Sequence, residues 1–315
     1  MIRVLFLRFS SLGDIILSNY SAMKLKKKYP EWEVTWLVDS LYADIVKVQP
    51  WINKVMEWNR KKDGNLGFVN AILETRHHNF DILLDMHDSD RSNLFSLCSG
   101  IPVRYCAHSK YPFTHTTFNT EYFFDTTEKI FDCHKYLYAP HVITKTVLKT
   151  SLPRGHTVAL AIGASYSIKR WPVKMCRNFC EALLSQGETV ILLGAGHEEI
   201  ALANEIMTNI HSDNVINFVG KLSTLELLDV IDASDVTVAG DTGILHIARA
   251  LGKPVVGLFG PSVLDELYMK SLTKCYYCTC PDLGCENWDC KKQCMTTISP
   301  ENVFVGVENI LSGVQ

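Results

Sequence analysis

Apolar and polar positions alternate along this chain in the way expected for buried strands that are followed by amphipathic helices. Residues 2–7 form a nearly continuous apolar run, which predicts a strand buried on both faces of a parallel sheet. A loop and a helix follow it, and this helix ends in a lysine cluster and Pro30. Further strands are predicted at 34–38, 54–57 and 81–85, with helical stretches at 42–49 and 67–77. The first half therefore predicts an α/β domain.

The second half repeats this alternation after an irregular stretch. Residues 105–132 have no clear period and predict a long loop, a helix is expected at 134–149, and the Pro and Gly of residues 150–155 predict a linker. Strands are then predicted at 157–162, 189–193, 236–239 and 255–258, and helices at 172–186, 197–211, 224–233 and 242–251. We therefore expect two Rossmann-like domains, 1–150 and 151–299, with ligands bound where the strands end. A final helix within 300–315 is expected to pack back on the first domain.

Composition narrows the classes of function. The chain has 315 residues, 47% of them hydrophobic, and Lys+Arg 31 against Asp+Glu 34 gives no basic field for nucleic acid. The N-terminal apolar run is too short for a signal peptide or a membrane span, so we expect a cytoplasmic protein.

The segment Asp241-Thr242-Gly243-Ile244-Leu245-His246 begins where a predicted strand ends and a helix starts. Free backbone N–H groups at such a position bind anions, so a phosphate fits there. Thr242 adds a hydroxyl donor, Gly243 permits close approach, and His246 follows one turn later. The alternative is that Asp241 only caps the helix and His246 is a core histidine.

Ser10-Ser11-Leu12-Gly13-Asp14 repeats the same strand-loop-helix arrangement in the first domain. Asp14 becomes a candidate base that removes the proton of an acceptor hydroxyl during transfer at an anomeric carbon. An ordinary N-cap cluster is the alternative.

A third loop, from Ser165 to Pro172, contains Lys169 and Arg170, which could neutralise a diphosphate; a solvated basic turn is the alternative. Gly194-Ala195-Gly196 lacks the third glycine of a dinucleotide site, and the sequence contains no Gly-Lys-Ser/Thr phosphate loop. Nicotinamide enzymes and NTPases are therefore disfavoured. Glu198, after a predicted strand, is a candidate for accepting hydrogen bonds from a ribose.

These residues together resemble glycosyltransferase family 9, the ADP-heptose:lipopolysaccharide heptosyltransferases and their relatives. The resemblance covers nearly the whole chain and rests on residues 8–14, 169–172, 220–223, 258–262 and, above all, 240–254. It implies the GT-B fold, with two Rossmann-like domains whose parallel sheets face across a cleft, and inverting transfer without an obligatory divalent cation. It implies Asp14 and Lys169 as catalytic residues. The donor-binding residues expected are Ser10, Ser11, Gly13, Ser165, Glu198, Leu222, Asp241, Thr242, Gly243 and His246. Residues 85–92 resemble an acceptor-domain segment of the family, but with a histidine and additional acids.

Six cysteines lie between Cys275 and Cys294 with the short spacings of thiolate metal sites. The most ribbon-like pairing joins Cys275 and Cys278 with Cys290 and Cys294, and Cys280 and Cys285 are alternatives. Relatives with cysteines at this place, some of which bind iron, support a structural iron or zinc. The alternative is a set of reduced thiols in a surface insertion.

We therefore expect an enzyme that transfers heptose or a related sugar from an ADP-sugar to a hydroxyl of a lipopolysaccharide core or another glycan. The alternatives are transfer to protein, and a non-catalytic metal-thiolate protein on the same fold. The Lys24–Lys28 cluster could bring the enzyme to anionic glycolipid at the inner face of the membrane, although a solvated helix end also explains it.

Overall fold

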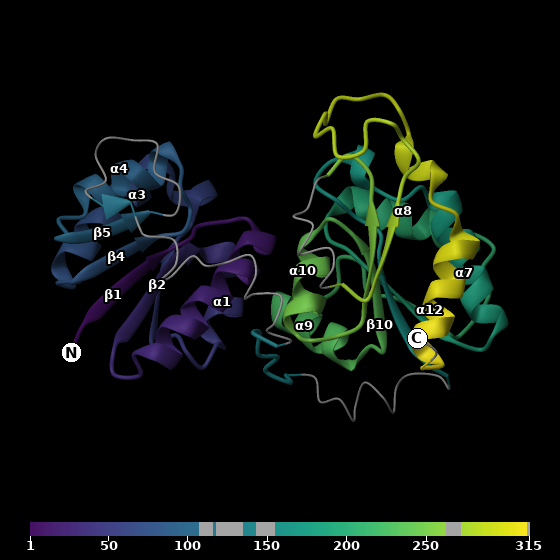
Figure 1. Cartoon of the computed structure of the whole chain (residues 1–315), viewed down its shortest axis with the longest axis horizontal. Helices are drawn as coiled ribbons and strands as arrows, with labels where there is room; N and C mark the ends of the chain where they lie inside the picture. Colours follow the sequence, from purple (N-terminus) through teal and green to yellow (C-terminus); the bar gives the residue numbers. More distant parts are fainter. Residues whose placement is uncertain (107–115, 118–134, 143–154, 263–271, 314–315) are drawn as a thin grey trace. The chain divides into compact units, whose positions relative to one another are not determined.

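The chain folds into two compact units, Met1–Tyr138 and Ala139–Gln315, which are coloured purple to blue and teal to yellow in Figure 1. This computed structural model describes residues 1–106, 116–117, 135–142, 155–262 and 272–313. The domain boundary predicted at residue 150 lies outside the described residues. Each unit is built around one sheet of six strands, and every strand pair in these ranges is parallel. The predicted α/β class is confirmed.

The first sheet has the order β3-β2-β1-β4-β5-β6. Its strands are β1 (Arg3–Leu7), β2 (Glu33–Asp39), β3 (Lys54–Trp58), β4 (Ile82–Asp85), β5 (Val103–Cys106) and β6 (Thr116–Thr117). The helical elements are α1 (Leu12–Lys28), η1 (Ser40–Tyr42), α2 (Ala43–Lys47), α3 (Arg60–His77) and α4 (Asp90–Cys98). Strand order reverses between β1 and β4, so the loops that follow these two strands lie next to each other.

An aromatic cluster fixes the loop that follows β1. Phe9 is fully buried and packs edge to face on Trp58 at 5.2 Å and on Phe95 at 6.3 Å between ring centroids. Aromatic pairs in this geometry add roughly 0.5–1.5 kcal/mol each to the burial of their surface. The backbone between Arg8 and Ser10 is therefore anchored in the core, and Ser11, which follows it, is exposed.

The second sheet has the order β12-β11-β10-β7-β8-β9. Its strands are β7 (Thr157–Ala161), β8 (Thr189–Leu193), β9 (Val215–Asn217), β10 (Val236–Gly240), β11 (Val255–Phe259) and β12 (Lys274–Tyr277). Its helical elements are η2 (Ser167–Lys169), α7 (Val173–Ser185), α8 (His197–Met207), α9 (Thr224–Ala233), α10 (Gly243–Ala250), η3 (Cys294–Thr297) and α12 (Pro300–Leu311). Residues of β7, β8, β10 and β11 are almost all buried, as the continuous apolar runs of the sequence predict.

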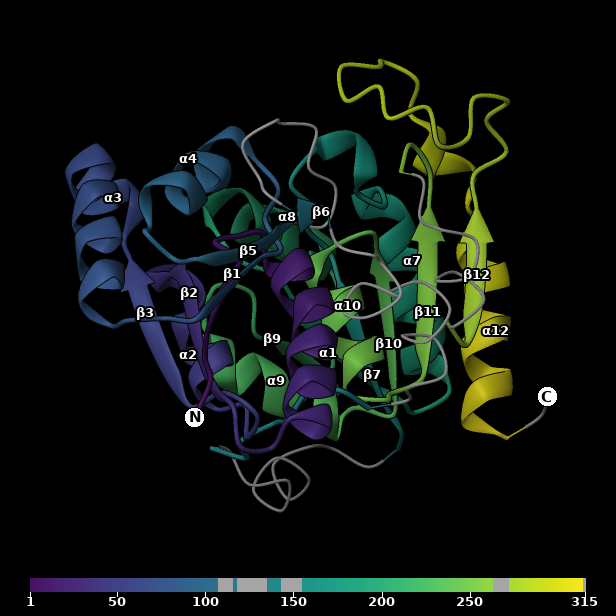
Figure 2. The same cartoon turned by 60° about the vertical axis from the view of Figure 1, so that its left-hand side comes forward.

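Helix α12 lies along α7 and the β11–β12 side of the second sheet, as Figures 1 and 2 both show. The Tyr276 hydroxyl donates a hydrogen bond to the Asn302 carbonyl at 2.7 Å, and it lies where a Cβ on Gly306 would stand. A contact between this helix and the first unit stays a prediction.

Some elements differ from the sequence expectations. Strands β5, β6, β9 and β12 and helix α4 had not been predicted. The loop expected at 105–132 is wrong for residues 105–106 and 116–117, which pair as parts of β5 and β6. Helix α4 lacks a clean apolar stripe because Leu94 and Leu97 are exposed beside buried Phe95. The helix predicted at 134–149 is wrong for residues 135–142, which include Pro140 and have no regular structure. The rest of that helix, and most of the loop predicted at 105–132, lie outside the described residues. No helix in the described ranges is long and apolar enough to cross a bilayer.

Candidate active site

The predicted donor residues divide between the two units: Ser10, Ser11 and Gly13 lie in the first, and the others lie in the loops and first helical turns at the carboxyl ends of the strands of the second sheet. Because β11, β10, β7, β8 and β9 are adjacent and parallel, the loops at their carboxyl ends are neighbours. Strand order reverses between β7 and β10, which is where open α/β sheets bind ligands. The loop with Lys169 follows β7, and the one with Asp241 follows β10.

Lys169, Asp241 and His246 form a compact charged cluster at this point. Lys169 Nζ lies 2.5 Å from Asp241 Oδ2, and His246 Nε2 lies 3.7 Å from Asp241 Oδ1. Burial acts to raise the pKa of Asp241, but His246 and Lys169 outweigh it and hold this pKa far below its usual value. The Asp241 carboxylate is thus ionised and held between two partners.

The N-terminus of α10 lies beside this cluster. Thr242 is the N-cap residue, and its Oγ1 is buried without a hydrogen-bond partner among the described residues. A buried hydroxyl without a partner is unfavourable, and a ligand oxygen at the end of the helix would satisfy it together with the first backbone N–H groups. This is the arrangement that binds phosphate groups.

Two glycines allow the loops to approach the sheet closely. A Cβ on Gly240 would stand 3.3 Å from the Lys169 carbonyl oxygen, so the backbone of η2 packs directly on the end of β10. A Cβ on Gly163 would collide with the Glu199 carboxylate, which accepts the Ala195 N–H at 2.5 Å. Burial raises the pKa of Glu199. No sequence pattern indicated Glu199, which holds the β8–α8 loop against the end of β7.

The remaining predicted donor residues are not part of the charged cluster. Glu198 is exposed and forms a bidentate ion pair with Arg170, in which Nη1 and Nη2 donate to Oε1 and Oε2 at 2.6 and 2.9 Å. Arg170 also donates to the Ala164 carbonyl, so it points to the α8 side and not to Asp241. Ser165 is exposed, and Leu222 is half-buried in the loop after β9.

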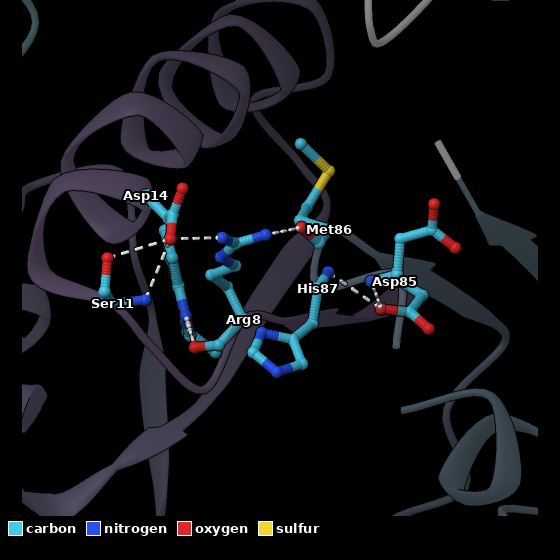
Figure 3. Close-up of polar contacts among 8 residues, drawn as sticks. Arg8, Ser11, Asp14, Asp85, Met86 and His87 are labelled. Carbon is cyan, nitrogen blue, oxygen red and sulfur yellow. Dashed lines mark hydrogen bonds and ion pairs between the residues drawn. The ribbon is translucent and has the colours of Figure 1, made fainter. Parts of the chain in front are cut away.

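The first unit places Asp14 in a network at the carboxyl end of β1 (Figure 3). Arg8 Nη2 lies 2.6 Å from Asp14 Oδ2, and the other Arg8 Nη donates to the Met86 carbonyl. Ser11 is the N-cap of α1, and both its N–H and its hydroxyl donate to Asp14 Oδ2 at 3.0 and 2.9 Å. Burial acts to raise the pKa of Asp14, but the Arg8 charge and the Ser11 hydrogen bonds lower it further than burial raises it. The capping interaction expected as an alternative to a catalytic role is therefore present, and the two roles are compatible. Ser10 and Gly13 lie in the same loop and first turn.

Next to this network lie two titratable groups from the loop after β4. Burial raises the pKa of Asp85 to about 6, and its Oδ1 accepts the N–H groups of His87 and Asp88 at 2.9 and 3.2 Å. Burial, with the charges of Arg8 and Arg60, lowers the pKa of His87 to about 4. His87 also packs edge to face on Phe9, 5.0 Å between centroids. A neutral imidazole therefore lies beside the Arg8–Asp14 pair, and only the resemblance to an acceptor-domain segment had pointed to it.

The predicted metal ligands are not brought together within the described residues. No three potential ligands converge on one point within the described ranges, and no disulfide joins the described cysteines. Cys275 lies in β12 opposite Gly257, and Cys278 continues the ladder by donating its N–H to the Phe259 carbonyl. Side chains three residues apart on an extended strand point to opposite faces, so Cys275 and Cys278 cannot chelate one ion here. Instead, Cys278 and Cys280 lie near Cys294 and help burial raise its pKa to about 11. Cys290 accepts the Lys292 N–H, and Cys285 is exposed. As arranged, these residues do not fit a tetrahedral thiolate site.

Comparison with known proteins shows the family of the chain. The model of glycosyltransferase family 9 (heptosyltransferase) matches residues 133–297. Lipopolysaccharide heptosyltransferase 1 of Campylobacter coli is 24% identical over 339 aligned positions, which cover 98% of each chain.

Solved structures match the fold of this chain over both units. The structure of E. coli ADP-heptose lps heptosyltransferase II matches with a TM-score of 0.78 at 18% identity and covers 99% of each chain. That of E. coli heptosyltransferase WaaC with ADP-2-deoxy-2-fluoro heptose matches with a TM-score of 0.72 at 17% identity, covering 98% of this chain and 99% of that one. These likenesses confirm the predicted GT-B fold.

Proposed function

Because the chain belongs to glycosyltransferase family 9, we propose that it transfers heptose from ADP-heptose to a hydroxyl of a lipopolysaccharide-core acceptor, with inversion at the anomeric carbon. The relative named above that matches over its whole length is a lipopolysaccharide heptosyltransferase, and one matching structure contains an analogue of ADP-heptose. Both support this choice of donor and acceptor.

The observation that carries the proposal is the Lys169–Asp241 pair beside the unpartnered Thr242 hydroxyl. When the bond from the anomeric carbon to phosphate breaks, negative charge develops on the diphosphate. An ammonium and a helix N-terminus that are already in place stabilise that charge without reorganisation. We assign the diphosphate to Lys169, Thr242 and Gly243, and the transfer needs no divalent cation.

Asp241 and His246 are assigned to the sugar. An ionised carboxylate accepts hydrogen bonds from sugar hydroxyls, and the Asp241 carboxylate is kept ionised by its two partners. Glu198 is assigned to the ribose and Leu222 to the adenine, with Ser165 at the edge of the same loop cluster. Glu198 would exchange part of its contact with Arg170 for the ribose hydroxyls.

The proton of the acceptor hydroxyl goes to Asp14. All its contacts within the described residues are made by Oδ2, which leaves Oδ1 for the acceptor. In one step the acceptor oxygen bonds to the anomeric carbon, the bond to phosphate breaks, and the proton passes to Oδ1. A carboxylate with a lowered pKa is a weak base, so the proton moves late, when the acceptor oxygen already carries positive charge. Ser10, Ser11 and Gly13 hold the loop that presents this carboxylate.

We expect the reaction to take place on the cytoplasmic side of the membrane. The lysines proposed to contact the membrane also have partners within the first unit. Lys26 donates to the Trp32 carbonyl at 2.6 Å, and the Nζ atoms of Lys24 and Lys28 each lie 5.4 Å from the centroid of a tyrosine ring. They therefore stabilise the C-terminal end of α1, and contact with anionic lipid stays a prediction.

The test is turnover of ADP-heptose by the wild-type chain and by Asp14→Asn. We expect kcat to fall by about 10²- to 10⁴-fold, the usual range for a general base, with ADP affinity retained. Asp44→Asn is the matched control, because Asp44 is an exposed carboxylate of the same unit that pairs with Lys47 at 3.3 Å. Full turnover in Asp14→Asn would exclude the base, and a wild-type chain that does not bind ADP would exclude the function. A protein hydroxyl offered in place of the glycan acceptor separates the two classes of acceptor.

A further inference from the structure

The segment from Lys274 to Ile298, here termed the Cys-rich segment, is fastened to the edge of the sheet that carries the candidate donor site. Gly284 donates its N–H to the Gly260 carbonyl at 3.0 Å, and Glu286 donates to the Pro261 carbonyl at 2.8 Å. Both acceptors belong to the loop that follows β11. Two backbone hydrogen bonds thus fix the middle of the segment beside the loops that follow β10 and β7.

Side-chain packing holds the end of the segment at the same place. A Cβ on Gly260 would stand 2.6 Å from Met295 Sδ and 3.1 Å from Cys294 Sγ, so glycine permits this close approach. Cys294 and Met295 are buried in the core of the second unit. The segment is therefore part of the folded second unit and not a loose insertion.

Trp288 lies in this segment and reaches the loop after β7. Its ring stacks on Tyr166, with 4.9 Å between centroids and an interplanar angle of 13°. Lys169 Nζ lies 5.2 Å from the Trp288 centroid, and this ammonium is the one that contacts Asp241 at 2.5 Å. The negative face of an indole attracts an ammonium, and more strongly where water is excluded.

We propose that Trp288 is a positioning residue of the donor site, which holds the Lys169 ammonium against the end of α10 before the donor binds. The proposal rests on the function proposed above, in which Lys169 meets the diphosphate. A lysine side chain loses rotamer entropy when it is fixed on a ligand, and a partner that orders it beforehand raises affinity. Stacking on Tyr166 keeps the ring in place.

The test is ADP affinity, measured by titration calorimetry, for Trp288→Leu and Trp288→Phe. Leucine keeps apolar volume but has no aromatic face, whereas phenylalanine keeps the face. We expect Trp288→Leu to bind ADP about fivefold to tenfold more weakly and Trp288→Phe to stay within about twofold of the wild type. The KM for the sugar nucleotide should rise in Trp288→Leu while kcat stays near the wild-type value.

The control is Trp32→Leu, because Trp32 also stacks on a tyrosine, Tyr29, at 4.0 Å, but lies in the first unit. Thermal unfolding of each variant verifies that it is folded. The proposal would be overturned if Trp288→Leu bound ADP as tightly as the wild type. It would also be overturned if the leucine and phenylalanine variants lost the same ADP affinity, because the loss would then come from packing and not from the aromatic face. A wild-type chain that does not bind ADP would instead exclude the proposed function.

Discussion

Replacing Lys169 by methionine removes one charge of a partly buried ion pair and keeps most of the side chain's length. The Lys169 and Asp241 side chains are 13% and 18% exposed, and their charged atoms are 2.5 Å apart. At an effective dielectric constant of about 20, the attraction between them is roughly 7 kcal/mol before desolvation is subtracted. Most of this is offset by removing the charges from water, and His246 remains beside Asp241. We therefore expect Lys169→Met to destabilise the second unit by about 2 kcal/mol at pH 7.

This loss should depend on pH in a fixed direction. The pKa of Asp241 in the folded chain lies below its ordinary value of 3.8. Its ionised form therefore stabilises the fold above pH 3.8, and this contribution disappears as the pH falls through the lower, folded value. Removing Lys169 weakens that contribution and raises the pKa of Asp241. The difference in free energy of unfolding between the wild type and Lys169→Met should have its full size at pH 7 and should become smaller as the pH falls below about 4.

Calorimetry is the assay, and ADP identifies the transition of the second unit by raising its Tm. A loss of about 2 kcal/mol corresponds to a fall of about 4–8 °C for a unit of this size. The double variant Lys169→Met/Asp241→Asn should be more stable than the sum of the two single changes predicts, by about 1–2 kcal/mol. The reasoning would be refuted if the two substitutions changed the free energy of unfolding additively within about 0.3 kcal/mol. It would also be refuted if the stability difference between the wild type and Lys169→Met became larger at low pH.

Three further predictions concern other residues of the two loop clusters. Arg8→Met should raise the pKa of Asp14, since the Arg8 charge lowers it, so the acidic limb of the kcat/KM profile should move to higher pH; Arg8→Lys should move it less, and an unmoved limb in Arg8→Met would contradict this. Thr242→Val should weaken ADP binding about tenfold with little change in Tm, because the hydroxyl has no partner among the described residues, while Thr242→Ser should bind normally. Because the pKa of Asp85 is raised to about 6 in the folded chain, its protonated carboxyl stabilises the fold fully below pH 3.8. This stabilisation is lost as the pH rises through 6. Between pH 4 and 7 the wild type should therefore lose about 1–3 kcal/mol of unfolding free energy relative to Asp85→Asn, as measured by urea unfolding. A stability difference between the two proteins that stays constant over this pH range would exclude this prediction.

The site residues that follow strands could be predicted because parallel topology decides where they lie. Asp241 and Lys169 each follow a continuous apolar run, and the ends of parallel strands share one edge of the sheet. The pattern located these loops without any knowledge of the strand order. The same reasoning located Asp14 at the end of β1.

Side-chain partners could not be predicted, because they depend on packing between distant segments. Arg170 follows Lys169 directly, and both had been expected to neutralise the diphosphate. The structure turns Arg170 to Glu198, 28 positions away, because consecutive side chains in the loop point in different directions. Arg8 belongs to the motif that indicated Asp14, but its own role as the partner of Asp14 and Met86 is visible only in three dimensions.

The cysteines show a different limit. Their spacing is that of a metal site only if the intervening residues form a turn, and the pattern contained no sign that Lys274–Tyr277 is a strand. Once Cys275 is in a ladder with β11, the pair with Cys278 is divided between two faces. Trp288 was missed for a related reason, since a single aromatic residue in an irregular stretch has no periodicity that indicates its partner.

The position of β7 in the second sheet has a consequence for how the chain is made. Strand β7 pairs with β8, which follows it closely, and with β10, which is synthesised much later. Lys169 leaves the ribosome 72 residues before Asp241, and the loop between them must close before the two can meet. The three described strands that precede β10, which are β7, β8 and β9, carry only the Lys169 part of the charged cluster until β10 docks. A nascent chain that ends before Gly240 therefore lacks Asp241, Thr242 and the N-terminus of α10, and we expect it to bind the diphosphate of the donor only after β10 and α10 have been added.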